Sequence, residues 1–542
     1  MARCPREYRI RGIRRSEKIK INKQATIEKG KKGFFGLVYG RTAVVVLLLV
    51  LQVIILMAGF FWLGEYMYYI YGGVTALAVL LVLFIINKRE NPAFKLVWII
   101  LILLVPVFGA MLYLFVELQI GTKWMNARIQ KLHQQMRRYT VQDQVVAQNL
   151  ERENQQVAHL ANYINRFGGY PAYQNTSAKF FPIGEDKFKE MVIQLEKAEK
   201  FIFLEYFIIH EGYMLNTVVD ILKKKVKQGV EVRFMYDGMC SLALMPYRYP
   251  EELEKYGIQC RMFSPVKPAL STHQNNRDHR KVLVIDGRVA FTGGVNLADE
   301  YINQKVRFGH WKDTAIMIEG DAVRSFTLMF LEMWNLDKYK VIEDYDKYLS
   351  VNFQKTPDAG DGFVIPYGDN PLDREPVGEL VYMDILNTAN RYVHIMTPYL
   401  VLDNEMMTAL TYAAKRGVEI IIIMPHIPDK WYAFVLAKTY YNELLDAGVH
   451  IYEYTPGFVH AKGFISDDVK AVVGTINLDF RSLYLHFEDA VYMYKNSAVA
   501  DVERDFQETL KKCQKITQED YKKQKLFNKL AGRVLRLLAP LM

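Results

Sequence analysis

The clearest chemistry in this 542-residue chain lies in two copies of one short motif, in which one residue separates a histidine from a lysine. Each copy continues, at the same spacing, with an aspartate, a glycine and an asparagine. The copies are His279, Lys281, Asp286, Gly293 and Asn296, and His460, Lys462, Asp467, Gly474 and Asn477. Residues i and i+2 of a β-strand point to the same face, so each imidazole and its neighbouring ammonium can meet one substrate.

Two such copies, brought together, suit exchange at a phosphodiester. One neutral imidazole can attack phosphorus, while the second, protonated, gives its proton to the leaving alkoxide and later takes one from the incoming alcohol. Lysines and asparagines can hold the non-bridging oxygens and stabilise the charge of the transition state. The four cysteines show no CxxC or Cys/His spacing, and no other group has metal-ligand spacing, so we expect no metal and no cofactor.

The segments around the two motifs repeat one another in order, which indicates the elements that must position them. Each half has a helix end, a glycine and a β-branched strand, VKQGVEVRFMYD in the first and AKRGVEIIIIMP in the second. YGIQCRMFSP and AGVHIYEYTP follow, and the motifs come last. We therefore predict an α/β fold with two α/β/α lobes, at 181–345 and 363–510, that form an intrachain pseudo-dimer joined by a linker at 346–362.

Three uncharged apolar runs precede the lobes, at residues 42–63, 66–86 and 96–116. Each is 21 or 22 residues long, which is enough for a helix to cross the roughly 30 Å hydrocarbon core of a bilayer. We expect an N-terminal transmembrane region at 42–116, followed by a juxtamembrane helix and linker at 117–180. Basic residues flank the region on both sides, so the positive-inside rule leaves the number of spans and their orientation open.

Positive charge is concentrated at the two ends of the chain. Residues 1–41 carry 13 basic and three acidic side chains, and residues 511–542 carry nine and two, for net charges of +10 and +7. The whole chain carries a net charge of +10, so residues 42–510 have a net charge of −7. A nucleic-acid-binding protein usually carries basic charge along its binding face, so we expect no nucleic-acid partner. The tails favour an anionic lipid leaflet. Apolar and basic residues at helical spacing in 522–541 predict an interfacial amphipathic helix, with a helix docked on the lobes as the alternative.

The motifs and their surroundings resemble the bacterial cardiolipin synthases, which are members of the phospholipase D superfamily. The resemblance rests on NNRDHRK, GGVNLADEY, GHWKDT, GFVHAK and GTINLDFRSL, and on the closing RLLAPLM. It also covers a membrane hairpin, NPAFKLVWIILILLVPVFGAMLYLF. It implies that both lobes have the phospholipase D-like fold.

The resemblance also implies roles for the site residues. His279 is expected to be the nucleophile that carries the phosphatidyl group, and His460 the general acid and base. The residues expected to bind the substrate phosphate are Lys281, Lys462, Asn296 and Asn477. Asp313 and Glu488 are expected to hydrogen-bond the catalytic imidazoles and fix their tautomers. Asp286 and Asp467 are the remaining members of the predicted catalytic set. The family resemblance implies that they hold the loop after each motif and do not touch the phosphate.

Two positions depart from the family pattern. A small hydroxyl residue usually follows the motif glycine, and it is Thr475 in the second copy but Gly294 in the first. His486 stands where asparagine is usual in cardiolipin synthases. The second departure affects the surroundings of Glu488 and leaves the core motif intact.

The resemblance implies a membrane-bound phosphatidyltransferase. One phosphatidylglycerol would donate its phosphatidyl group to a histidine and release glycerol, and a second would attack this intermediate to give cardiolipin. The expected partners are phosphatidylglycerol, other anionic phospholipids and the bacterial cytoplasmic membrane, in which the chain would be a multi-pass protein. Three alternatives stay open: transfer to another acceptor such as phosphatidylethanolamine, hydrolysis of phospholipid or nucleic acid, and a membrane scaffold without catalytic activity. The oligomeric state also stays open.

Overall fold

The computed structural model describes residues 67–117, 120–266, 275–336, 345–349, 362–373 and 375–541, together with isolated positions between 50 and 61. The predicted basic tail at 1–41, most of the apolar run at 42–63 and most of the linker at 346–362 lie outside these residues. Gly73–Pro265 and Ser271–Met542 together form one compact unit, which contains both α/β lobes.

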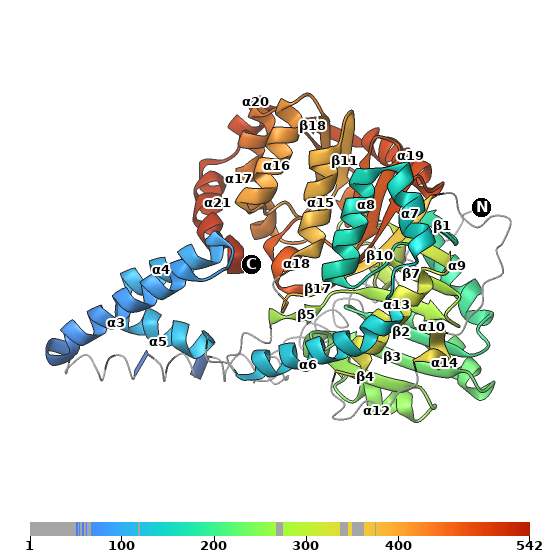
Figure 1. Ribbon diagram of the computed structural model, residues 1–542. Helices are drawn as coiled ribbons and strands as arrows, with labels where there is room; N and C mark the ends of the chain where they lie inside the picture. Colours follow the sequence, from blue (N-terminus) through green and yellow to red (C-terminus); the bar gives the residue numbers. More distant parts are fainter. Residues whose placement is uncertain are drawn as a thin grey trace, which may run out of the picture. The chain divides into compact units, whose positions relative to one another are not determined.

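Seven strands form the sheet of the first lobe, in the order β1-β9-β7-β6-β2-β3-β4. They are β1 (Thr176–Phe181), β2 (Phe201–Tyr206), β3 (Glu231–Asp237), β4 (Gln259–Phe263), β6 (Lys281–Ile285), β7 (Val289–Gly293) and β9 (Ala315–Gly320). The neighbouring strands β2, β3 and β4 are labelled in Figure 1. β2, β3 and β4 run parallel, and the remaining pairs are antiparallel. Every residue of β2 is buried, as its unbroken apolar run predicts for a strand covered on both faces.

The second lobe repeats this order strand for strand, as β10-β17-β16-β15-β11-β12-β13, and adds β18 beside β13. Its strands are β10 (Phe363–Asp369), β11 (Tyr392–Met396), β12 (Glu419–Pro425), β13 (His450–Tyr454), β15 (Gly463–Ser466), β16 (Lys470–Gly474), β17 (His486–Tyr494) and β18 (Cys513–Ile516). Each strand of the first sheet has a counterpart at the same place, which confirms the predicted duplication. Because β18 completes the sheet, this lobe extends beyond the predicted boundary at residue 510.

Helices cover both sheets, and one of them joins the two lobes. The long helices are α9 (Gly184–Glu196), α10 (Tyr213–Lys227), α13 (Val323–Trp334), α15 (Val377–Thr388), α16 (Asn404–Lys415), α17 (Trp431–Asp446) and α19 (Ala498–Leu510). The short ones and the C-terminal helix are α11 (Cys240–Ala243), α12 (Tyr249–Glu254), α14 (Asp346–Leu349), α18 (Phe480–Tyr484), α20 (Gln518–Lys522) and α21 (Leu526–Leu538). α13 is buried except at Arg324 and contacts β2 and β6 of one sheet and β10 of the other. One hydrophobic cluster therefore extends through both lobes, and a second lies mainly within the first lobe.

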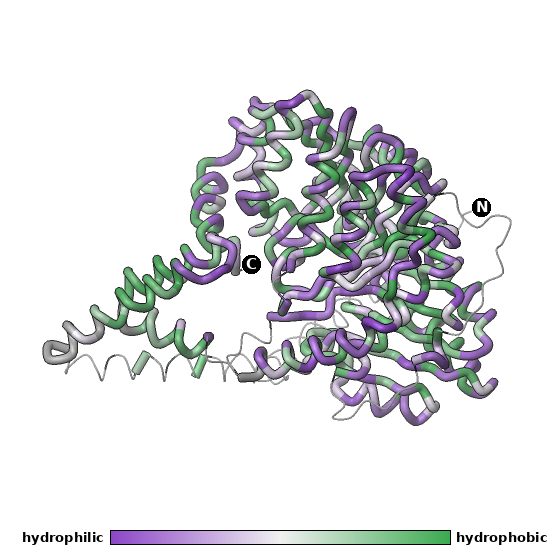
Figure 2. Tube along the Cα trace, viewed as in Figure 1, coloured by the Kyte–Doolittle hydropathy of each residue, from purple (hydrophilic) through white to green (hydrophobic). Residues whose placement is uncertain are grey.

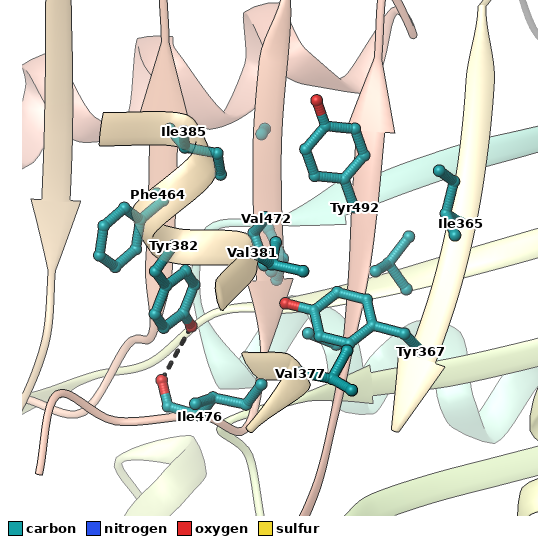
Figure 3. Packing of buried hydrophobic residues seen from close by; sticks show 14 of the residues in the cluster. Ile365, Tyr367, Val377, Val381, Tyr382, Ile385, Phe464, Val472, Ile476 and Tyr492 are labelled. Atoms are coloured by element: carbon teal, nitrogen blue, oxygen red, sulfur yellow. Dashed lines mark hydrogen bonds between the residues drawn. The ribbon is translucent and has the colours of Figure 1, made fainter. Parts of the chain in front are cut away.

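Packing in the second lobe fixes the turn that carries Asn477 (Figure 3). The ring of Tyr382 on α15 stacks on Phe464 of β15, with centroids 3.9 Å apart. The Tyr382 hydroxyl donates to the carbonyl oxygen of Ile476 at 3.0 Å. Both groups are buried, so this bond also satisfies a carbonyl that water cannot reach. α15 thereby positions the backbone directly before Asn477.

The predicted juxtamembrane helix and linker at 117–180 contain several helices in place of one long helix. The segment contains α6 (Ile120–Met136), α7 (Gln144–Glu153) and α8 (Gln155–Tyr163). The Asp143 side chain accepts from two backbone amides at the start of α7, and the Asn154 side chain accepts from one at the start of α8. Such short polar side chains satisfy the free amides at helix N-termini and thus divide the segment. The first lobe begins with β1, slightly before the predicted boundary at 181.

The apolar run at 96–116 is also not one helix. It divides into α4 (Pro92–Leu104) and α5 (Pro106–Glu117), because Pro106 has no amide hydrogen and disfavours a helical backbone at Val105. The two helices pack against each other at Gly109, where a Cβ atom would lie 2.8 Å from the Ile102 Cα atom. The run therefore forms a helical hairpin.

The remaining N-terminal helix, α3 (Met67–Asn87), covers the apolar run at 66–86. Within the ranges that the structure describes, no helix has both the length and the apolar character needed to cross a membrane. Hydrophobic residues nonetheless lie along α4 (Figure 2). The start of α4 is tied to the second lobe, since the Asn91 side chain donates to Asp403 and to Tyr484, each at 2.9 Å.

Candidate active site

Short strands from each lobe cross to the other at the motif histidines. β5 (Arg277–Asp278) pairs with β17 of the second lobe, and β8 (His310–Lys312) of the first lobe pairs with β14 (Gly457–Val459) of the second. The backbone amide of His279 donates to the Phe487 carbonyl at 2.9 Å, and that of His460 donates to the Lys312 carbonyl at 2.7 Å. Both motifs therefore lie where the lobes meet.

Each motif histidine binds a carboxylate that belongs to the opposite lobe. His279 Nδ1 lies 2.8 Å from the nearer carboxylate oxygen of Glu488, and His460 Nδ1 lies 2.7 Å from Asp313 Oδ2. When Nδ1–H donates to the carboxylate, the lone pair of each ring is at Nε2. The carboxylates thus set both imidazoles in the tautomer that can accept a proton or attack an electrophile.

The electrostatics keep both imidazoles neutral. Burial lowers the pKa of His279 well below its ordinary value, and the charges of Lys281, His486, Lys462 and His460 lower it further. Burial lowers the pKa of His460 to about 4, although the charge of Asp313 acts in the opposite direction. Since Lys462 and His460 act on His279 from the other lobe, the two motifs share one site.

The two lysines are buried beside their histidines. The ammonium of Lys281 donates to the His279 carbonyl, and that of Lys462 donates to the His460 carbonyl. Burial lowers the pKa of Lys281 to about 8 and that of Lys462 to about 7. Two desolvated ammonium groups close to one another favour the binding of a phosphate group.

The two asparagines differ in how they are held. Asn296 is fully engaged, since its Oδ1 accepts from the Ile208 amide at 2.9 Å and its Nδ2 donates to the Tyr301 hydroxyl at 2.8 Å. Asn477 Oδ1 is buried without a hydrogen-bond partner among the described residues. The Tyr301 ring also lies 5.5 Å from that of His460, so this tyrosine, which sequence reasoning missed, links Asn296 to the second motif.

Asp286 and Asp467 do not meet the reacting groups, and their place in the catalytic set is corrected. Asp286 accepts three backbone amides before β2, at 2.7 to 2.8 Å. Asp467 accepts the three equivalent amides before β11, at 2.8 to 3.0 Å. Both follow the far end of the strand that begins at or directly after the motif lysine, about 16 Å from that lysine at ~3.3 Å per residue. They hold a loop, as the family resemblance implies.

Comparison with known proteins assigns this arrangement to a family. A family model described as the phospholipase D-like domain of cardiolipin synthase matches residues 191–334 and 382–510. A second, described as a phospholipase D-nuclease N-terminal region, matches residues 76–117. A cardiolipin synthase of Alkalihalophilus pseudofirmus is 33% identical over 470 residues, which are 86% of this chain and 93% of the relative. The chain belongs to the cardiolipin synthase family.

Two other proteins are similar to this chain. An uncharacterized protein of Streptococcus mutans is 52% identical over 463 residues, which cover 85% of this chain and 99% of that protein. The crystal structure of a phosphatidylserine synthase from Haemophilus influenzae superposes with a TM-score of 0.51 at 14% identity, covering 71% of this chain and 98% of that one. The second likeness shows the shared fold. Membership of the cardiolipin synthase family places the chain among the phosphatidyltransferases of the phospholipase D superfamily.

The geometry explains why the two cardiolipin synthase motifs differ after their glycines. A Cβ atom on Gly294 would lie 1.9 Å from Asp313 Oδ1, so any side chain there would displace the carboxylate that binds His460. At the equivalent place, the Thr475 hydroxyl donates to Glu488 at 2.5 Å. The short aspartate thus requires a glycine, whereas the longer glutamate is held by a hydroxyl.

His486, the other departure from the family pattern, lies beside the first histidine. Its ring centroid is 5.4 Å from that of His279, and its Nδ1 is 3.9 Å from Glu488 Oε1. Among the described residues, neither ring nitrogen of His486 has a hydrogen-bond partner. Ligand atoms of His279, His486 and Glu488 lie within 4.8 Å of one another, so these three could hold a metal ion. Sequence spacing gave no sign of this group.

Proposed function

We propose that the chain joins two phosphatidylglycerol molecules to form cardiolipin and glycerol. The observation that carries this proposal is the exchange of carboxylates across the lobes, which presents two neutral imidazoles to one site with two buried ammonium groups. The site has one group that can form a bond to phosphorus and a second that can move the proton. The two buried ammonium groups support the binding of a phosphodiester, whose oxygens accept hydrogen bonds from N–H donors.

In the first half-reaction, His279 Nε2 attacks phosphorus of the donor lipid. A nitrogen–phosphorus bond forms and the bond from phosphorus to the glycerol headgroup oxygen breaks. The negative charge of the bound donor phosphate raises the proton affinity of His460, which takes up a proton before the step. As imidazolium, His460 then gives this proton to the headgroup oxygen, so that neutral glycerol leaves. Asp313 stabilises the imidazolium through the Nδ1–H hydrogen bond. Lys281 and Lys462 stabilise the negative charge on the non-bridging oxygens.

The second half-reaction reverses the proton transfer. The headgroup hydroxyl of the second phosphatidylglycerol gives its proton to neutral His460 while its oxygen attacks phosphorus. The nitrogen–phosphorus bond breaks, cardiolipin forms, and both imidazoles return to their starting protonation states. Water in place of this alcohol would give phosphatidic acid, so exclusion of water separates transfer from hydrolysis.

The different carboxylate environments support His279 as the nucleophile. The named influences on the pKa of His279 all lower it, which favours the neutral, attacking form. Burial and the charge of Lys462 lower the pKa of His460 as well, but the charge and hydrogen bond of Asp313 act against this lowering, which favours transient protonation. We assign the covalent role to His279 and the proton transfers to His460 on this difference.

We also propose that the enzyme acts at the bacterial cytoplasmic membrane as a multi-pass protein. Large apolar side chains of α3 and α4 are exposed, among them Leu80, Leu83, Leu103 and Leu104. A soluble surface rarely carries so many neighbouring exposed leucines. Lipid on these helices would hold the site close to substrates that do not leave the bilayer.

The decisive experiment uses purified full-length protein in vesicles that contain phosphatidylglycerol. Mass spectrometry and a glycerol assay should find cardiolipin and glycerol in equal amounts. Phosphatidic acid without cardiolipin would indicate a hydrolase, and neither product would reject the proposed chemistry. Vesicles that also contain phosphatidylethanolamine test whether another headgroup can accept the phosphatidyl group.

A further inference from the structure

The C-terminal helix α21 has one face packed on the protein and another left uncovered. Its Gly532 faces α17, where a Cβ atom would lie 2.6 Å from Thr439 Cγ2. The large apolar side chains on the other side are exposed, with Leu526 at 79% and Phe527 at 70%. The exposed apolar residues of the helix are Leu526, Phe527, Leu530, Val534, Leu537 and Leu538. The segment is therefore docked on the lobes, as the alternative prediction states, while its role at a membrane interface stays a prediction.

A polar cavity of about 250 Å³ lies between α17, α20 and α21. Four cations and one carboxylate line it, namely Lys438, Lys529, Arg533, Arg536 and Glu443. Arg536 lies over the Tyr440 ring at 4.6 Å, and Lys529 donates to the Lys522 carbonyl at 2.8 Å. Among the described residues, Arg533 forms no ion pair or hydrogen bond. Lys438 is paired with Glu453 at 3.2 Å, so the other three cations face the single lining carboxylate of Glu443. The cavity thus has excess positive charge, which suits an anion with several oxygens.

The cavity is separate from the catalytic histidines, since it shares no lining residue with their site. At the start of α17, Trp431 is half exposed and stacks with Phe527, with ring centroids 6.3 Å apart. Tryptophan in such a position is typical of the boundary between headgroups and acyl chains. Apolar side chains, an interfacial aromatic pair and a cationic cavity thus lie together on α17 and α21.

We propose that this surface, formed by the apolar face of α21, Trp431 and the cationic cavity, is a second lipid-binding site that seats the enzyme on an anionic phospholipid leaflet. The apolar face enters the acyl-chain boundary, and a headgroup phosphate occupies the cavity. An acidic protein would match the cations but not the exposed leucines beside them, whereas an anionic bilayer matches both. This inference does not depend on the catalytic proposal.

The test places an environment-sensitive fluorophore on Leu530→Cys in full-length protein from which Cys4 and Cys513 have been removed. In vesicles of phosphatidylglycerol and phosphatidylcholine, the emission should shift to the blue and be quenched by lipid-borne quenchers. The same label on Arg504→Cys, an exposed position on α19, should remain in water. A label at 530 that stays water-exposed in these vesicles would overturn the proposal. So would a shift seen already in detergent with a dimeric protein, since the occupant would then be a second copy.

The cavity is tested by a charge-matched pair of double variants. The double variant Arg533→Gln, Arg536→Gln, carrying the same fluorophore at position 530, should need more phosphatidylglycerol in the vesicles. The fraction of phosphatidylglycerol that gives half of the full blue shift should rise several-fold. Lys511→Gln with Lys523→Gln removes the same charge from residues that do not line the cavity, and should change this fraction much less. Equal effects of the two pairs, or equal shifts in pure phosphatidylcholine, would overturn the phosphate site. Neither readout uses turnover, so it is independent of cardiolipin synthesis.

Discussion

The two lobes share a strand order, yet they support their histidines by different means. In the first pair, the long carboxylate of Glu488 reaches His279 and is held by the Thr475 hydroxyl. In the second, the shorter carboxylate of Asp313 reaches His460 and leaves no room for a side chain at Gly294. A duplicated fold can thus give two identical side chains different proton affinities, which a reaction with one nucleophile and one acid requires.

The largest expected effect follows loss of either imidazole. His279→Ala removes the attacking nitrogen, and His460→Ala removes the proton donor, so each should lower cardiolipin formation by ~10⁴-fold or more. Initial rates with radiolabelled phosphatidylglycerol measure this loss. His159→Ala, at an exposed position on α8, is the control and should keep the full rate. Substantial activity in either catalytic variant would refute the shared site.

Neutral replacements of the two carboxylates sharpen the comparison. Asp313→Asn and Glu488→Gln should each lower the rate by ~10²–10⁴-fold. The charge of Asp313 raises the pKa of His460, so replacement of Asp313 by asparagine should lower that pKa. The part of the pH–rate profile in which activity falls as His460 loses its proton should then move to lower pH. Glu488→Gln should cause no such shift in this part of the profile. The pH dependence of the rate distinguishes the two, and identical profiles would contradict the assigned roles.

Changes behind the carboxylates should have smaller effects that differ between the lobes. Gly294→Ala forces Asp313 away from His460, since the added Cβ would overlap its carboxylate, and should cost about 100-fold in rate. Thr475→Ala removes one hydrogen bond to Glu488, worth ~1–2 kcal/mol, and should cost about tenfold. Steady-state rates test this order, and a larger loss for Thr475→Ala would reverse the comparison.

The motif aspartates should behave alike, in contrast to the rest of the site. Asp286→Asn and Asp467→Asn weaken a carboxylate that accepts three backbone amides, and each should cost ~1–3 kcal/mol of stability. Asparagine tolerates the left-handed backbone at both positions, where φ is 56°. Thermal unfolding should show lower midpoints, while turnover of the folded enzyme stays unchanged. A rate loss without destabilisation would restore a catalytic role.

The repeat could be predicted from the sequence because hydrophobic runs and glycines recur in the same succession in both halves. Sequence reasoning also named Asp313 and Glu488, because each stands at a matching place beyond its motif. It could not show that each serves the opposite lobe, since that contact depends on how the sheets dock across a shared core. It missed the caps at Asp143 and Asn154, where single residues override a long polar pattern. It also treated 96–116 as one apolar run, although the family resemblance implied a hairpin in this segment.

The central claim is tested most directly by trapping the covalent intermediate. Wild-type enzyme is mixed with phosphatidylglycerol, quenched within one turnover under conditions that preserve phosphohistidine, digested and sequenced by mass spectrometry. We predict a phosphatidyl group on His279, with glycerol released in equal amount before cardiolipin appears. An adduct on His460 would reverse the assigned roles, and active enzyme that yields no adduct on either histidine would contradict the mechanism.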